Sequence, residues 1–60
     1  MDEFYTKIAE YIEDENTDNE KYRQLAAMAP TEKAKTILND IASEEHTHMM
    51  FLKEILKDKE

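Results

Sequence analysis

The 60-residue sequence contains no cysteine, no glycine, no tryptophan and a single proline. The absence of cysteine excludes disulfides, thiolate metal sites and thiol chemistry. With no glycine and only one proline to interrupt it, the chain is expected to be mostly helical. No apolar run approaches the roughly 20 residues that a membrane-spanning helix needs. We therefore expect a small helical protein that does not insert into a membrane.

Basic residues are also scarce, since 8 Lys and Arg stand against 15 Asp and Glu, for a net charge of −7. This balance argues against binding to nucleic acid or to an anionic membrane, and it raises the local concentration of cations. Plain solubility explains the same charge equally well. The first residues, MDEFYTK, lack the basic and apolar regions of a signal peptide, so we expect a cytoplasmic protein.

One strong interruption, APTE at residues 29–32, divides the chain. Proline disfavours helical geometry in the residue before it and suits the first turn of a new helix. Thr31 is an alternative N-cap for that helix. We predict an all-α fold, an antiparallel two-helix hairpin with helices at about residues 2–29 and 31–58, forming one domain over residues 1–60.

Both segments carry inward-facing residues whose spacing alternates between four and three, as in helices that pack along a seam. The first series is Phe4, Ile8, Tyr11, Glu15, Asp18, Tyr22, Leu25 and Ala29, flanked by Ile12, Asn19 and Ala26. The second series is Ala34, Leu38, Ile41, Glu45, His48, Leu52 and Ile55. A lone hairpin of this size buries too little to be stable. We expect two hairpins to dimerise into a four-helix bundle, and the wide second stripe indicates a larger homo-oligomer.

Three positions on these series carry side chains that a core avoids, namely Glu15, Glu45 and His48, and Asp18 is a less certain fourth. Burying an ionised carboxylate without a partner costs several kcal/mol. No lysine or arginine lies on either series, so water, protons or a cation must compensate. At about 1.5 Å of rise per residue, Glu15 lies about 15 residues before the turn and the other two about 14 and 17 after it. We therefore expect the three at nearly the same height.

Glu45 and His48 are three residues apart, so they share one helix face and can converge on one ion. A lone Glu-x-x-His is common by chance, and the matched height of Glu15 is what makes this pair informative. Two copies related by a two-fold axis would supply the ligand set of di-iron and di-manganese carboxylate bundles. This oxygen-rich set suits iron or manganese, and zinc is a further possibility. The alternative is a non-catalytic helical dimerisation module whose polar layer fixes register.

From Ile12 to Leu56 the sequence resembles the ferritin-like superfamily, especially rubrerythrin-type domains and the short encapsulated ferritins. The motifs that carry the resemblance are Glu15-NTDNEK-Tyr22, LAAMAPTEKAKTILNDIA and Glu45-x-x-His48. The Glu-x-x-His motif occurs once, as in the encapsulated ferritins, whose metal centre is completed between two subunits. The resemblance implies a ferritin-like half bundle. Its expected location is the cytoplasm or an encapsulin-type protein shell.

The resemblance further implies a di-iron centre with ferroxidase activity, which oxidises Fe²⁺ with O₂ in iron storage or detoxification. Glu15 and Glu45 would be terminal or bridging carboxylates and His48 a terminal nitrogen ligand. The alternative activity is rubrerythrin-like reduction of peroxide, although the sequence holds no cysteine-rich rubredoxin segment. Tyr22 is similar in position to a tyrosine near the di-iron centre of the family. It would hydrogen-bond a ligand carboxylate or supply an electron, and a core tyrosine is an equal alternative.

Other polar residues near the motif have weaker interpretations. Glu44 or Asp18 would orient an imidazole of the partner chain through a hydrogen bond. Asp14 and Asp18 would guide cations toward the site, or are simply solvated. His46 lies off the series and is expected to point outward.

Overall fold

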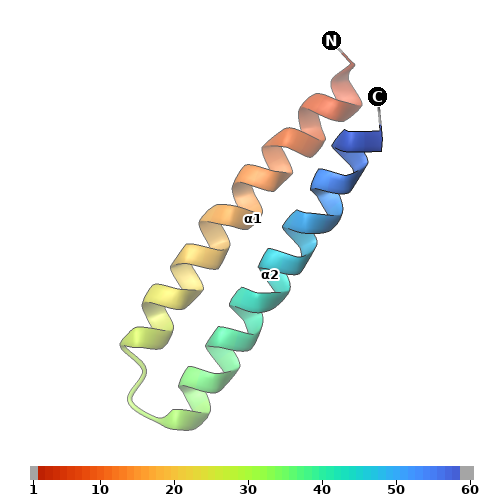
Figure 1. The fold of residues 1–60 in the computed structure, drawn as a ribbon. Helices are drawn as coiled ribbons and strands as arrows, with labels where there is room; N and C mark the ends of the chain where they lie inside the picture. Colours follow the sequence, from red (N-terminus) through yellow and green to blue (C-terminus); the bar gives the residue numbers. More distant parts are fainter. Residues whose placement is uncertain (1, 59–60) are drawn as a thin grey trace.

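The structure, a computed structural model, describes residues 2–58, which form two antiparallel helices joined by a short turn (Figure 1). Helix α1 spans Glu3–Ala27 and helix α2 spans Glu32–Asp58. The helices run side by side, so the start of α1 and the end of α2 lie at the same end of a rod whose Cα atoms extend 46 × 14 × 10 Å (Figure 1). The predicted all-α hairpin is confirmed.

Local hydrogen bonds set the limits of α1. The Asp2 carboxylate caps its N-terminus by accepting a hydrogen bond of 2.9 Å from the backbone N–H of Phe4. The helix ends at Ala27, two residues before the predicted end. Its last turn tightens there, because the N–H of Met28 donates to the carbonyl of Leu25 at 3.0 Å, three residues back.

The turn resolves the choice between the two predicted starts of α2. The hydroxyl oxygen of Thr31 accepts a hydrogen bond of 3.1 Å from the N–H of Ala34, and α2 begins at Glu32. Thr31 is therefore the N-cap, and Pro30 precedes the cap instead of occupying the first helical turn. The break lies where the sequence predicts it, although α1 ends at Ala27, before the residue that Pro30 directly restricts.

The hairpin buries one side of each predicted apolar stripe. The buried apolar side chains of the described chain are Ile8, Ala26, Ala42 and Met49. The three residues predicted to flank the first stripe, Ile12, Asn19 and Ala26, are half-buried or buried. By contrast, three residues predicted to face inward, Phe4, Tyr11 and Leu25, are exposed by 50% or more. The difference arises because each apolar stripe is wider than one helix–helix contact, so a single neighbouring helix covers only part of it.

Large apolar side chains remain uncovered on one side of the hairpin, which we call the open face: Phe4, Tyr11, Leu25, Ile37, Phe51 and Ile55. In α1, Phe4, Tyr11 and Leu25 are separated by multiples of seven residues, and in α2 the same is true of Ile37 and Phe51. Each group therefore lies along one side of its helix. Tyr11 and Phe51 line the same surface depression, which places both groups on the same side of the hairpin.

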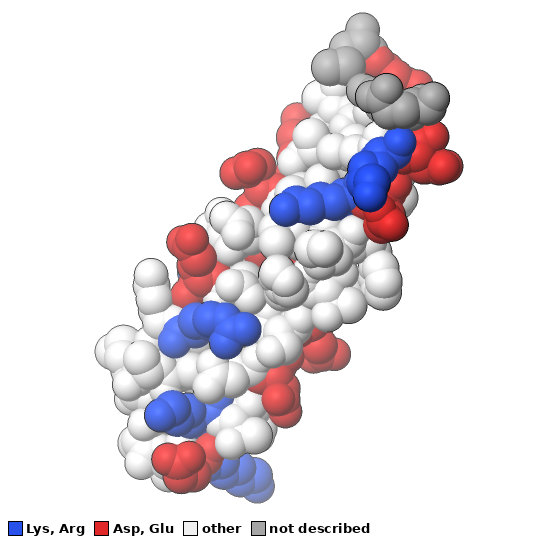
Figure 2. All heavy atoms as spheres, in the orientation of Figure 1, with Lys and Arg blue, Asp and Glu red and all other residues white. Residues whose placement is uncertain are grey.

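The outer surface is strongly charged. Acidic side chains are distributed along the length of the hairpin in the view of Figure 2. No charged or polar residue among residues 2–58 is fully buried. Within the same residues, neither helix is long and apolar enough to cross a membrane.

Candidate metal centre

The middle of the hairpin brings together the three side chains that the sequence singles out. Glu15 comes from the centre of α1, and Glu45 and His48 come from successive turns of α2. One potential ligand atom from each residue lies within 4.8 Å of the others. The expected equal height of the three residues is confirmed, because the antiparallel turn places the centres of the two helices opposite one another.

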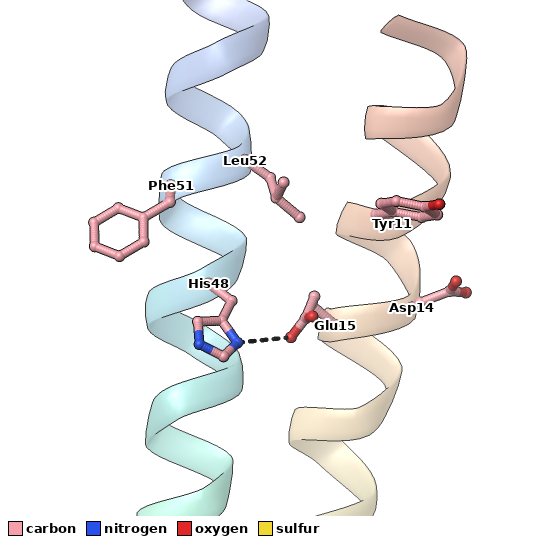
Figure 3. A pocket seen from close by; sticks show the side chains of 6 residues that line it. All are labelled: Tyr11, Asp14, Glu15, His48, Phe51 and Leu52. Atoms are coloured by element: carbon pink, nitrogen blue, oxygen red, sulfur yellow. Dashed lines mark ion pairs between the residues drawn. The ribbon is translucent and has the colours of Figure 1, made fainter. Parts of the chain in front are cut away.

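Glu15 and His48 point toward one another across the gap between the helices (Figure 3). Their nearest atoms, Nδ1 of the imidazole and Oε2 of the carboxylate, are 3.7 Å apart. This distance is too long for a hydrogen bond. Oε2 of Glu15 is nevertheless shielded from solvent and has no hydrogen-bond partner in the described chain. A shielded, unpartnered carboxylate oxygen is energetically costly, so the negative charge of the cluster is not fully compensated.

The pKa of the Glu45 carboxyl is raised above its ordinary value of 4.5. The largest cause is a hydrogen bond shared with the Glu15 carboxyl, which requires a proton between the two groups. Burial and the negative charges of Glu15 and Asp18 act in the same direction, and His48 opposes them. The neighbouring carboxyl groups therefore make ionisation of Glu45 less favourable than in an isolated side chain.

The shielded oxygen and the shared proton have one physical origin. Carboxyl groups gather here, and within residues 2–58 no lysine or arginine forms an ion pair with them. A divalent cation would meet the demand that the proton meets only partly, because it interacts with both carboxylates and with the imidazole at once. Two carboxylates and one imidazole are ligands that iron, manganese and zinc accept. Glu15, Glu45 and His48 thus fit a metal ion chemically, and they would supply its protein ligands.

A surface depression of about 400 Å³ adjoins the cluster. It is lined by Tyr11, Asp14, Glu15, His48, Phe51 and Leu52 (Figure 3). Leu52 points toward α1, whereas the ring of Phe51 projects away from it (Figure 3). The depression therefore opens on the open face, and His48, with 55% of its side chain exposed, stands at its edge. The cluster is accessible from the side that a second chain would approach.

The remaining candidates lie around the cluster. Tyr22 is half-buried and follows Glu15 by seven residues, about 10 Å along the helix. Asp18 is half-buried, and its charge acts on Glu45. Glu44 and His46 are exposed, and the outward orientation predicted for His46 agrees with this.

Two residues of the depression, Tyr11 and Phe51, were not predicted to adjoin the site. Their spacing carried a usable signal, because Tyr11 precedes Glu15 by four residues and Phe51 follows His48 by three. Such pairs are neighbours on a helix surface. Both aromatic rings therefore frame the ligand cluster at the end nearer the termini.

The chain matches no family model, no curated protein and no solved structure. The interpretation of the cluster therefore depends on the chemistry of its own residues. The likeness to ferritin-like domains comes from the sequence motifs alone.

Proposed function

We propose that the protein is a di-iron carboxylate protein with ferroxidase activity, and that its site forms between two copies of the chain. The observation that carries this proposal is the convergence of Glu15, Glu45 and His48, with ligand atoms within 4.8 Å of one another and a shielded carboxylate oxygen without a partner. Iron is the substrate of the reaction as well as the ion that the cluster holds.

The open face supports the involvement of a second copy. The ligand cluster borders this face midway along the hairpin, with Tyr11 and Phe51 toward the termini and Leu25 and Ile37 toward the turn. The hairpin exposes 4738 Å², whereas a compact monomer of 7.1 kDa exposes about 4,100 Å². An identical face, turned about a two-fold axis through the cluster, would cover the apolar residues of both copies.

Two-fold pairing also completes the ligand set. One copy offers two carboxylates and one imidazole, too few ligands for two metal ions. Two copies offer four carboxylates and two imidazoles, which is the arrangement of ferritin-like di-metal bundles, with one Glu from each of two helices and a Glu-x-x-His pair from each of the other two. The same pairing would make a ferritin-like four-helix bundle from two half bundles.

The oxidation balances with O₂ as the oxidant. Two Fe²⁺ ions each give up one electron, and one O₂ takes both electrons and two protons from water to leave as hydrogen peroxide. Carboxylates favour the product, because an anionic oxygen attracts Fe³⁺ more strongly than Fe²⁺. Binding the ion requires the ionised Glu45 carboxylate, so the raised pKa of Glu45 makes iron binding compete with a proton at this carboxyl.

The remaining residues have supporting roles in this proposal. His48 supplies a neutral nitrogen at the edge of the depression, where the oxidant would arrive. Tyr22 hydrogen-bonds a ligand carboxylate, donates an electron, or only fills the core. A Tyr22→Phe variant separates the two roles that need the hydroxyl from core packing, because it keeps the ring and removes the hydroxyl.

The activity test adds Fe²⁺ to anaerobic protein and then admits air, while ferric absorbance and oxygen uptake are recorded. The parent protein should oxidise iron faster than protein-free buffer. Glu45→Gln and His48→Ala should each lower the rate at least about tenfold, the scale on which lost ligand interactions act at metal sites. Glu54→Gln and His46→Ala are matched controls, because they alter exposed residues of the same types on the same helix.

Three outcomes would overturn the proposal. If Glu45→Gln and His48→Ala oxidise iron as fast as the parent, the cluster is not the site. If the ferrous protein reacts much faster with H₂O₂ than with O₂, the activity is peroxide reduction. A purified protein without metal, whose Tm does not rise with Fe²⁺ or Mn²⁺, would instead identify a non-catalytic dimerisation module.

A further inference from the structure

A side-chain hydrogen bond joins the two helices close to the ligand cluster. The amide Nδ2 of Asn19 donates to the backbone carbonyl of Ala42 over 2.6 Å. Asn19 is half-buried in α1, and Ala42 has no exposed surface in α2. The bond therefore crosses the hairpin where the small side chain of Ala42 lets the helices come close.

This bond lies about one helical turn from the ligands on both helices. Asn19 follows Glu15 by four residues and Ala42 precedes Glu45 by three, distances of about 6 and 4.5 Å along the axes. Because each helix is rigid over one turn, fixing Asn19 against Ala42 also fixes the height of Glu15 against Glu45.

Apolar packing contributes little to the axial register of α1 and α2 beside the ligand cluster. Residues 13–21 of α1, EDENTDNEK, include no apolar side chain, so α1 offers none between Ile12 and Tyr22. Interlocking apolar side chains normally fix the axial position of one helix relative to another. A directional hydrogen bond in the middle of this stretch is suited to take their place, as a single buried asparagine does in coiled coils.

We propose that Asn19 is a positioning residue that fixes the axial register of the two helices at the ligand cluster. The consequence for metal binding depends on the function proposed above, whereas the consequence for register does not. A slip of one residue moves Glu15 by about 1.5 Å relative to Glu45. Metal–ligand distances tolerate only about 0.2 Å, so a much smaller slip already weakens the site.

Replacement of Asn19 by leucine separates register from stability. The Ala42 carbonyl lies within α2 and keeps its helical hydrogen bond to the N–H four residues on, so the substitution leaves no unpaired carbonyl. The leucine adds apolar volume at a half-buried position. Asn19→Leu should therefore melt no lower than the parent, while the directional bond to the Ala42 carbonyl that sets the native register is lost. Asn19→Ala removes the same donor without added volume, and it serves if leucine disturbs the fold.

The first measurement is of metal-free protein by double electron–electron resonance. The chain has no cysteine, so cysteines replacing the exposed residues Glu20 and Lys53 take spin labels selectively. In the antiparallel hairpin these positions are offset by about 20 Å along the axis, so a slip changes their distance directly. Dilution with unlabelled protein keeps distances within one copy dominant. Asn39→Leu is the matched control, because Asn39 is also half-buried.

The expected result is a narrow distance distribution for the parent and Asn39→Leu, and a broadened or shifted one for Asn19→Leu and Asn19→Ala. Isothermal titration with Mn²⁺ then tests the consequence at the site, where both Asn19 variants should bind at least about tenfold more weakly than the parent. Unchanged distances in the Asn19 variants, or unchanged Mn²⁺ affinity beside a parent that binds, would overturn the positioning role. A parent that binds no Mn²⁺ would count against the proposed metal site, and the distances would still decide the role of Asn19.

Discussion

The covered and open sides of the hairpin have similar residues and different surroundings. Ile8 and Met49, on the covered side, are 7% and 8% exposed, whereas Phe4 and Phe51, on the open face, are 54% and 65% exposed. Both sides follow the same heptad spacing, so the sequence provides apolar surface for two contacts and one chain makes only one. The ligand cluster lies on the border between them, where Glu15 is half-buried and His48 is exposed.

The largest effect should come from a charge on the covered side. Met49→Asp places a carboxylate at a buried position without a partner, which should cost at least about 3 kcal/mol. A chain of this length has about 3–9 kcal/mol of stability in total. Circular dichroism should show most of the helical signal lost at 25 °C. Met50→Asp is the control, because Met50 is 49% exposed and should change stability by less than about 1 kcal/mol. Equal losses of helical signal from Met49→Asp and Met50→Asp would show that the two positions do not differ in burial as the structure describes.

A charge on the open face should break association and leave the hairpin contact intact. Phe51→Glu removes an apolar side chain from each half of the proposed interface, a loss of about 3 kcal/mol per pair or roughly a hundredfold in the dissociation constant. Sedimentation equilibrium should show the mass shift from dimer toward monomer. Met50→Glu, next in sequence and outside the open face, should keep the parent mass. A Phe51→Glu variant as fully associated as the parent would place the interface elsewhere.

The ligand cluster on the border between the two sides should make the stability of the metal-free protein depend on pH. Because the folded-state pKa of Glu45 is raised above 4.5, the folded protein binds a proton at this carboxyl more tightly than the unfolded chain does. The contribution of Glu45 to the free energy of unfolding of the metal-free protein is therefore fully present below pH 4.5. It is lost as the pH rises through the folded-state pKa of Glu45. Urea unfolding across this range should show the decline.

Glu45→Gln should flatten the pH dependence, whereas Glu44→Gln, at an exposed neighbouring position, should retain it. Saturating Mn²⁺ should reverse the slope, since metal binding requires the deprotonated carboxylate. A decline that persists unchanged in Glu45→Gln would assign it to another group.

The smallest effect should come from an ion pair that belongs to neither side. Lys57 Nζ lies 3.5 Å from Glu54 Oε2, with side chains 80% and 69% exposed. Solvent screens such a pair, so Lys57→Ala should change the free energy of unfolding by less than about 0.5 kcal/mol. Urea unfolding measures this directly. A larger loss would show that the C-terminal turn of α2 takes part in a contact beyond the hairpin.

Much of the fold was predictable because a helix gives each residue a direction. The single proline located the turn, and counting from it placed Glu15 level with Glu45 and His48, which the structure confirms. The helix predicted at about residues 2–29 includes the acidic run at residues 13–20, and α1 is continuous there.

The side of the stripe that the hairpin covers was not predictable from spacing. Tyr11 and Ile12 both lie within one broad apolar face, and periodicity alone does not decide which of them meets α2. In the structure Ile12 and Asn19 are half-buried against α2, whereas Tyr11 is exposed. The hydrogen bond from Asn19 to Ala42 was missed for the same reason, because Asn19 was assigned to the flank of the stripe.

The location of Glu15, Glu45 and His48 on one chain has a consequence for mixed populations under the proposed pairing. In the proposed pair, every complete centre draws on both copies, so a copy with a defective cluster disables the centre of any sound copy that it joins. With random pairing, the share of fully intact centres falls as the square of the fraction of sound chains. A cluster variant that still folds and pairs would therefore act dominantly when it is produced alongside the parent.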